Sequence, residues 1–372
     1  MNDVGILTFH CSDNYGAMLQ AYGLKEYLKQ KNVKAEIVRY EPPYMTGRHW
    51  WIPYVPLGNV FSTLWYGWHK WKRNREKGKA FFVRRANMKH FRSNYLIGRE
   101  QKKRWLSCHL NSLPYSYYIV GSDQIWNPEV TCGLKSVYFG AFRGNNKKRV
   151  IAYAASLGGV SLSSRYDQKF SKLIKHVDAI SVREEGAIPY IKQFYAGNVQ
   201  MVPDPVFLLS KRTWEKIEQL PEKEHYIVVY ITEKNEELTA YVKELSKKQG
   251  IEIIQIASDI DLTYEEFDQI YTAGPSEFLG YIHKADYVIT NSFHATAFSI
   301  IFEKKFIVFQ HCSAGERIRN ILKTYGLENR LYQQNKNIEI DAVVDWDKVR
   351  KQGEESRRAG ENFLKNHLNG FR

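Results

Sequence analysis

The first forty residues contain a β-α-β pattern that decides the class of fold. Val4-Gly5-Ile6-Leu7-Thr8-Phe9 is an apolar stretch typical of a buried strand, residues 17–30 carry apolar side chains at helical spacing, and residues 35–40 form a second strand. A polar loop that ends in Asn14-Tyr15-Gly16 joins the first strand to the helix. Because ligands of parallel α/β sheets bind at such strand-to-helix loops, we expect this loop to face a cleft.

The same alternation continues along the chain. Further strands are expected at 117–120, 149–154 and 179–182, and each is followed by a polar or glycine-bearing loop. Beyond Pro203-Asp204-Pro205 the alternation restarts. The later strands are expected at 226–232, 251–257, 286–290 and 306–310. The sequence therefore predicts an α/β fold with two doubly wound, Rossmann-like domains.

We place the domain boundary at Pro203-Asp204-Pro205, because two prolines fit a connection better than a helix or a strand. The expected parts are an N-terminal α/β domain (1–205), a C-terminal α/β domain (206–345) and a helical tail (346–372). Residues 41–104 break the alternation and form an insertion in the first domain. A chain of 372 residues is long enough for two cores of this size.

Composition excludes several classes of protein. The chain is 44% hydrophobic and 25% charged, and it has no apolar run of about 20 residues that could span a bilayer. No secretory signal is visible, so we expect a cytoplasmic protein. The four cysteines lie far apart, which argues against a zinc site, and we expect no metal. Neither GxGxxG nor a P-loop is present, so a small anion or a sugar fits the cleft better than a dinucleotide.

The insertion carries most of the charge. Residues 67–104 hold 14 Lys or Arg against two Glu, which accounts for +12 of the net charge of +14. Tryptophans at helical spacing followed by a basic cluster predict a basic amphipathic helix, which suits an anionic membrane surface. The residues expected to contact the membrane are Trp65, Trp68, Trp71, Lys72 and Arg73. A lid packed on the N-terminal domain and a nucleic-acid surface are the alternatives, although no nucleic-acid motif accompanies the helix.

His294 is the strongest candidate for chemistry. It follows the strand 286–290 and Asn291-Ser292, which are good helix N-caps, so it is expected in the first turn of a helix. The N–H groups of such a turn attract anions. The helix dipole favours the neutral imidazole, and a bound anion raises its pKa again, which suits a proton donor that becomes active with substrate. The alternative is a histidine that only caps or packs the helix.

Two arginines and several residues at strand ends are further candidates. Arg183 ends the strand 179–182 and could bind a carboxylate or phosphate with two hydrogen bonds, or pair with a neighbouring glutamate. Arg317, near the start of a later helix, has the same two interpretations. The other polar residues of these loops are Ser122, Asp123, Ser156 and Asp204. The aspartates could accept hydroxyl protons or form turns. Ser156 does not lie in a GxSxG sequence, so the chain does not look like a hydrolase.

Seven short motifs stand in a fixed order within residues 4–325. They are Gly5-Ile6-Leu7-Thr8-Phe9-His10, Asn14-Tyr15-Gly16-Ala17, Val120-Gly121-Ser122-Asp123-Gln124-Ile125-Trp126-Asn127, Tyr153-Ala154-Ala155-Ser156, Ser181-Val182-Arg183-Glu184, Asp204-Pro205 and Thr290-Asn291-Ser292-Phe293-His294. In this order they resemble the polysaccharide pyruvyl transferase family. The resemblance leaves the tryptophan-rich insertion and the tail uncovered. Ala295 departs from the Gly of many members, which a helix accepts readily.

The resemblance implies a GT-B-like fold, with two domains facing a cleft, and transfer of the enolpyruvyl group of phosphoenolpyruvate to a sugar as a cyclic ketal. His294 matches the family's catalytic histidine and Arg183 its anion-binding arginine, which implies a general acid and a donor-binding residue. Arg317, Asn291 and Ser292 are expected to contact the donor as well. Contacts to donor or acceptor are also expected from Asn14, Tyr15, Gly16, Ser122, Asp123, Ser156 and Asp204. No cofactor is expected, because phosphoenolpyruvate is itself the donor substrate.

The family acts in bacteria, usually on capsular, exopolysaccharide or cell-wall precursors. The acceptor sugars of such pathways are often carried on a polyprenyl diphosphate in the inner leaflet. This gives the tryptophan-rich helix a reason to bind the cytoplasmic membrane face as part of a peripheral protein, with no nucleic-acid partner. The alternatives are a GT-B-type nucleotide-sugar glycosyltransferase and a non-catalytic scaffold with a decayed site.

Overall fold

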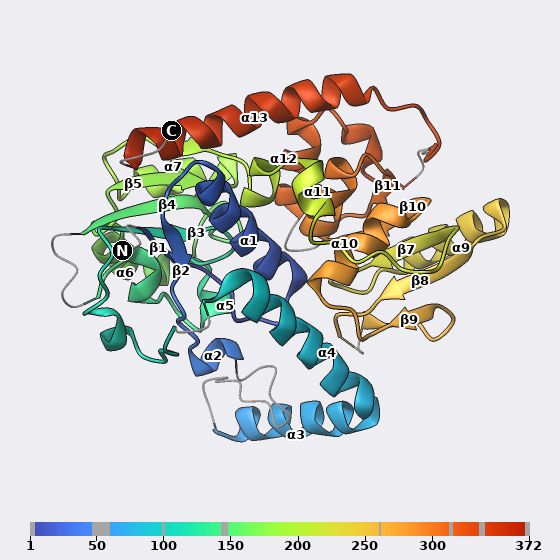
Figure 1. Cartoon of the computed structure of the whole chain (residues 1–372), viewed down its shortest axis with the longest axis horizontal. Coiled ribbons are helices and arrows are strands. Elements are labelled where there is room, and N and C mark those ends of the chain that lie inside the picture. Colours follow the sequence, from blue (N-terminus) through green and yellow to red (C-terminus); the bar gives the residue numbers. More distant parts are fainter. Residues whose placement is uncertain are drawn as a thin grey trace. The chain divides into compact units, whose positions relative to one another are not determined.

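Two units, each built around its own parallel sheet, make up the chain in the computed structural model (Figure 1). Unit 1 comprises Met1–Gly78, Lys89–Leu208 and Arg357–Arg372, and unit 2 comprises Lys79–Met88 and Leu209–Ser356. The residues that the structure describes are 4–46, 60–98, 101–142, 148–259, 262–311, 315–334 and 339–368.

Over the described residues, the sheet of unit 1 has six parallel strands in the order β2-β1-β3-β4-β5-β6. They are β1 (Val4–Leu7), β2 (Ala35–Ile37), β3 (Tyr117–Gly121), β4 (Arg149–Ala155), β5 (Ala179–Val182) and β6 (Val199–Met201). The order reverses between β1 and β3. In doubly wound sheets ligands bind at the carboxyl ends of the strands that flank such a reversal.

The sheet of unit 2 has five parallel strands, in the part of the chain that the structure describes, in the order β11-β10-β7-β8-β9. They are β7 (Tyr226–Tyr230), β8 (Glu252–Ile256), β9 (Asp268–Ile270), β10 (Tyr287–Thr290) and β11 (Lys305–Val308). Here the order reverses between β7 and β10, as in a Rossmann fold. The predicted fold class, α/β with two doubly wound units, is confirmed.

Helices connect the strands of each sheet. In unit 1 they are α1 (Tyr15–Gln30), α2 (Pro43–Thr46), α3 (Val60–Lys77), α5 (Pro128–Thr131), α6 (Asp167–Ile174) and α7 (Ile188–Lys192). In unit 2 they are α8 (Lys211–Glu215), α9 (Glu236–Gln249), α10 (Pro275–Lys284), α11 (Phe293–Ile301) and α12 (Gly315–Thr324). Two helices, α4 (Lys79–Phe91) and α13 (Trp346–His367), have residues in both units. The basic amphipathic helix predicted in the insertion is α3.

Part of the predicted insertion belongs to unit 2. The sequence places residues 79–88 in the N-terminal domain, whereas the structure groups them with the second sheet. The reason is local hydrogen bonding: Arg84 Nη1 donates to the carbonyl oxygen of Ala257 at 3.2 Å, and Asn87 Nδ2 donates to that of Thr272 at 3.0 Å. These contacts join residues more than 170 positions apart, which no local sequence pattern indicates.

The C-terminal tail is helical, as predicted, and it is divided between the units at Arg357. In unit 2, Arg350 of α13 pairs with Glu303. In unit 1, the ring of Phe363 packs against Tyr153, with the ring centres 6.2 Å apart. The tail therefore contributes to the packing of both units and does not form a separate domain.

Two close approaches of the backbone position the loops of unit 1. Gly23 of α1 lies against the connection after β6, where a Cβ atom would stand 2.7 Å from the carbonyl oxygen of Pro205. Gly121 ends β3 with φ +123°, and a Cβ atom there would stand 2.2 Å from the carbonyl oxygen of Tyr153 in β4. Both glycines adjoin candidate site residues, because Asp204 precedes Pro205 and Ser122 follows Gly121.

The loop after β3 is also anchored by an aromatic core. The indole of Trp126 is fully buried, stacks on Phe139 at 5.2 Å, and donates from Nε1 to the carbonyl oxygen of Tyr138 at 2.8 Å. Phe170 of α6 packs edge-on against both rings. A buried tryptophan with a satisfied N–H group contributes a large apolar area, so the loop that begins at Ser122 has a rigid base.

We predict that Gly121→Ala destabilises the protein more than Gly133→Ala does. Gly133 also has a positive φ, of +86°, but no atom lies within 4 Å of where its Cβ would be. The Gly133 variant should therefore lose only about 1–2 kcal/mol through backbone strain. Overpacking against Tyr153 should add about 1–3 kcal/mol in the Gly121 variant. Urea unfolding of both variants measures the difference, and equal losses would contradict the steric argument.

Candidate functional site

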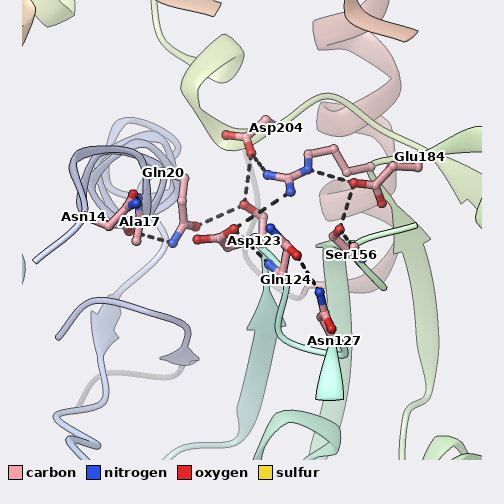
Figure 2. Close-up of polar contacts among 12 residues, drawn as sticks. Asn14, Ala17, Gln20, Asp123, Gln124, Asn127, Ser156, Glu184 and Asp204 are labelled. Atoms are coloured by element: carbon pink, nitrogen blue, oxygen red, sulfur yellow. Dashed lines mark hydrogen bonds and ion pairs between the residues drawn. The ribbon is translucent and has the colours of Figure 1, made fainter. Parts of the chain in front are cut away.

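A buried polar network lies at the carboxyl edge of unit 1, where the strand order reverses (Figure 2). Ser122 directly follows β3, and its hydroxyl group donates to Oε1 of Gln20 in α1 at 3.0 Å. Gln20 Nε2 donates to Oγ1 of Thr8, just after β1, at 2.8 Å. All three side chains are buried. One residue of α1 thus ties together the two strands that flank the reversal.

Arg183 is the centre of a charged cluster in the same network. It directly follows β5, as predicted; Nη1 donates to Asp204 Oδ2 at 2.8 Å and Nε donates to Glu184 Oε1 at 3.2 Å. Asp123 Oδ1 lies 3.9 Å from Nη2. Dashed lines at Asp204 and Glu184 in Figure 2 mark these interactions. The Arg183 side chain is only 3% exposed, so three carboxyl groups surround a cation that solvent barely reaches.

The charge of Arg183 is stabilised by this surrounding. Burial alone lowers the pKa of Arg183, but the nearby carboxyl groups of Glu184, Asp204 and Asp123 outweigh burial and hold the pKa above its ordinary value. The cluster joins the loops that follow β3, β5 and β6. The geometry therefore gives Arg183 a part in holding the edge of the sheet together, and its predicted contact with a donor anion stays a prediction.

Ser156 and Asp204 are held inside the same network. The Ser156 hydroxyl donates to Glu184 Oε1 at 2.8 Å and accepts from the N–H of Gly158 at 3.0 Å. Asp204 Oδ1 accepts from the N–H of Val206 at 3.1 Å. Both side chains are buried, whereas Asp123 is partly exposed. Of the acidic candidates at this edge, Asp123 is therefore the one that solvent or a ligand reaches.

The first loop of unit 1 presents one exposed candidate. Asn14 is exposed and caps α1, since its Oδ1 accepts from the N–H of Ala17 at 3.0 Å. Tyr15 and Gly16 are buried in the first turn. Arg92 Nη2 donates to Oδ1 of Asp13 at 2.9 Å and fixes the loop ahead of the cap. A ligand at this loop would therefore meet Asn14 and the start of α1.

At the carboxyl edge of unit 2, Asn291 ties together the strand ends that flank the reversal. Its Oδ1 accepts from the N–H of Thr232, after β7, at 2.8 Å, and its Nδ2 donates to the carbonyl oxygen of Glu233 at 2.8 Å. Ser292 is the extended N-cap of α11, and its N–H donates to Thr290 Oγ1 at 2.9 Å. A fully buried amide thus fixes the loop from which α11 starts.

His294 lies in the first turn of α11, as predicted. The imidazole is half-buried and meets the ring of Phe293 edge-on, with the ring centres 5.2 Å apart. The Ser292 side chain makes no cap hydrogen bond, so it does not occupy the N–H groups of this turn. The positive end of the helix dipole adds to their attraction for an anion.

Two candidates of unit 2, Glu233 and His311, were not predicted. Glu233 is the third residue after β7, His311 is the third after β11, and His311 Nδ1 lies 3.6 Å from Glu233 Oε2. Burial and the charge of Arg317 in α12 lower the pKa of His311, whereas the carboxyl group of Glu233 raises it. The pKa of His311 lies below its ordinary value as a result. Their signal in the sequence is a polar residue just beyond a strand, the pattern that identified Asp123.

The predicted residues thus form two sets, one in each unit. The set of unit 1 is Asn14, Tyr15, Gly16, Ser122, Asp123, Ser156, Arg183 and Asp204, and the set of unit 2 is Asn291, Ser292, His294 and Arg317. Hydrogen bonds and the ion pairs of Arg183 fix most of the first set. The second set places an imidazole at a helix start and can supply a proton beside an anion. Across the described ranges, no group of three or more His, Cys, Asp or Glu could hold a metal ion.

The predicted membrane-contact residues lie on α3. Trp65 is 64% exposed and Trp68 is 55% exposed, and Leu64 and Lys72 are exposed beside them. Trp71 is half-buried, and the Arg73 side chain lies outside the described residues. No helix in the described part of the chain is long and apolar enough to cross a membrane. Large exposed apolar side chains of this kind are often found where proteins bind a partner or a membrane, and the predicted membrane contact stays a prediction.

Known proteins similar to this chain fall into one family and several distant structures. A family model described as polysaccharide pyruvyl transferase matches residues 14–313. No curated protein matches the sequence. The solved UDP-GlcNAc 2-epimerase of Methanocaldococcus jannaschii is 11% identical, over 96% of this chain and 98% of that chain, with a TM-score of 0.43. A structure of S. aureus MnaA with UDP is 10% identical, over 100% and 92%, with a TM-score of 0.48.

We predict that Arg183→Ala lowers the free energy of unfolding by about 3–5 kcal/mol, because it leaves the buried carboxyl groups of Asp204 and Glu184 without their cation. Arg165→Ala, which removes an exposed arginine of unit 1, should change stability by less than about 0.5 kcal/mol. Urea unfolding measures both effects. A loss of the same small size in the two variants would show that the Arg183 cluster contributes nothing to the fold.

Proposed function

The chain belongs to the polysaccharide pyruvyl transferase family, and from this premise we propose that it transfers the enolpyruvyl group of phosphoenolpyruvate to a sugar as a cyclic ketal. The observation that carries the proposal is the position of His294 in the first turn of α11, beyond the strand reversal of unit 2. A helix start receives anions, and an imidazole there can donate a proton.

The proposed reaction makes three demands on the site. A proton must reach the methylene carbon of the donor so that C2 becomes electrophilic, which is the role of His294 as general acid. The phosphate and carboxylate must be held, for which the start of α11 and Arg317 are proposed. Two sugar hydroxyl groups then add at C2 while phosphate leaves. Asp123 and Asn14 are proposed to contact the substrates, because Asp123 is partly exposed and Asn14 is exposed at the edge of unit 1. None of these steps needs a metal or an added cofactor.

His294→Gln should lower the rate of pyruvyl transfer at least about a hundredfold, because glutamine can form hydrogen bonds but cannot donate a proton to carbon. The measurement is mass spectrometry of candidate acceptor sugars incubated with phosphoenolpyruvate, together with the release of phosphate. Thermal unfolding of the variant should match that of the parent, since His294 is half-buried and lies at a helix start.

Two outcomes would contradict the proposal. A parent protein that binds UDP- or GDP-sugars in calorimetry but not phosphoenolpyruvate would support a nucleotide-sugar glycosyltransferase instead. A His294→Gln variant that transfers pyruvyl groups as fast as the parent would remove the general acid from this position. His225→Gln serves as the control, because His225 is an exposed histidine of the same unit, ahead of β7.

The second part of the proposal concerns where the acceptor is met. We propose that the sugar is carried on a polyprenyl diphosphate and that α3 binds the cytoplasmic face of the membrane. Leu64, Trp68 and Lys72 are spaced by four residues and therefore share one face of α3. Tryptophan prefers the headgroup level of a bilayer, and lysine and arginine bind anionic lipid. A capsular or exopolysaccharide precursor is the proposed acceptor.

Replacing Trp65 and Trp68 with serine should weaken binding to vesicles that contain phosphatidylglycerol by about tenfold or more, because both indole rings would leave the interface. Flotation of the protein with such vesicles measures the change. Vesicles of phosphatidylcholine alone carry no net charge, so the difference in binding between the two kinds of vesicle gives the electrostatic contribution. Leu220→Ser with Val343→Ser is the matched control, because it removes exposed apolar side chains of unit 2. If the tryptophan variant floats with the vesicles as well as the parent does, the membrane proposal is wrong.

A further inference from the structure

Glu233 and His311 lie beyond the two strands that flank the strand leading to His294. In the sheet of unit 2, β10 stands between β7 and β11, and all three strands are parallel. Glu233 follows β7, His311 follows β11, and His294 lies in the helix that follows β10. Parallel strands end at the same edge of a sheet, so the three residues belong to one edge.

The contacts around Glu233 hold it in place from two directions. Asn291 Nδ2 donates to the Glu233 carbonyl oxygen at 2.8 Å, and the Thr232 N–H donates back to Asn291 Oδ1 at 2.8 Å. On the other side, Oε2 of the Glu233 carboxyl group lies 3.6 Å from His311 Nδ1. The side chains of His311 and Glu233 are 12% and 27% exposed, so they are sheltered but within reach of a ligand.

We propose that His311, positioned by Glu233, accepts the proton of the first sugar hydroxyl group in the proposed ketal-forming reaction. The inference rests on the proposed function. The hydroxyl O–H bond breaks as its oxygen bonds to C2 of the donor, and the proton moves to Nε2 of His311. As the bond between C2 and the phosphate oxygen breaks, this proton passes to the phosphate. The oxygen of the second hydroxyl group then bonds to C2 in place of the phosphate, its O–H bond breaks, and its proton moves to His294. This proton replaces the one that His294 gave to the methylene carbon, so the enzyme returns to its starting state.

The charges that face His311 suit a base. Burial lowers the pKa of His311, and Arg317 of α12 lowers it further, whereas Glu233 raises it. The balance lies below the ordinary value, so the imidazole is neutral at neutral pH and ready to accept a proton. Once it is protonated, the carboxyl group near Nδ1 stabilises the imidazolium, which is the part that an aspartate plays beside the histidine of serine proteases.

The test is the pH dependence of kcat and kcat/KM for pyruvyl transfer in the full-length protein and its variants. A required base gives an acid limb and a required acid gives an alkaline limb. His311→Gln should lose the acid limb and lower kcat by roughly a hundredfold or more, with little change in KM for phosphoenolpyruvate. His294→Gln should lose the alkaline limb instead.

Two further variants shift the acid limb without removing the base. Glu233→Gln removes the charge that raises the pKa of His311, so the limb should move to lower pH. Arg317→Gln removes a charge that lowers this pKa, so the limb should move to higher pH. A residue that only stabilises the fold would not move the limb in these opposite directions.

His283→Gln is the matched control, because His283 Nδ1 also pairs with a glutamate, Glu218, at 2.8 Å, but in α10 ahead of β10. It should keep the pH profile of the parent. If the parent transfers pyruvyl groups and His311→Gln retains its turnover and acid limb, the role of His311 is wrong. An acid limb that stays in place in Glu233→Gln contradicts the role of Glu233. A parent that transfers no pyruvyl group contradicts the proposed function itself.

Discussion

The candidate sites depend on one constraint, which is that the paired strands of the described residues all run parallel. In each sheet every paired strand runs the same way, so every strand ends at one edge and the next helix begins there. Polar residues that are far apart in the sequence are thereby collected at the same edge. At the strand reversal the connections on either side leave in opposite directions, and the polar residues face the gap between them. Ser122 in unit 1 and Asn291 in unit 2 occupy this position and bridge it with their own hydrogen bonds.

The two edges solve the problem of buried polar groups in different ways. In unit 1, carboxyl groups enclose Arg183, and the side chains of Ser122 and Ser156 are buried. Most polar atoms of this edge therefore form hydrogen bonds or ion pairs with one another. A buried ion pair is costly to break, and this makes the edge a rigid frame. In unit 2, a buried amide holds the loops, while the imidazoles of His294 and His311 remain partly accessible.

Local features could be predicted from the sequence, and long-range contacts could not. The helix start at His294 follows from Asn291-Ser292 after an apolar strand, and the position of Arg183 follows from the strand before it; both depend on a few neighbouring residues. The Arg183–Asp204 pair joins loops after β5 and β6, and the Glu233–His311 pair spans 78 positions. Such pairs arise from the strand order, which one sequence does not disclose. The transfer of residues 79–88 to unit 2 has the same cause.

The difference between the edges bears on where proton transfer belongs. A group that exchanges protons with a substrate must be reachable and must have a charge state that changes near the working pH. Arg183 meets neither condition, since its side chain is buried and its pKa is raised. His311 is partly exposed, and burial together with Arg317 lowers the pKa of its imidazole, which favours the neutral form that a base requires. We therefore propose that proton transfer takes place at the edge of unit 2, whereas the hydrogen-bonded network of unit 1 would offer a ligand its shape and its hydrogen-bonding groups.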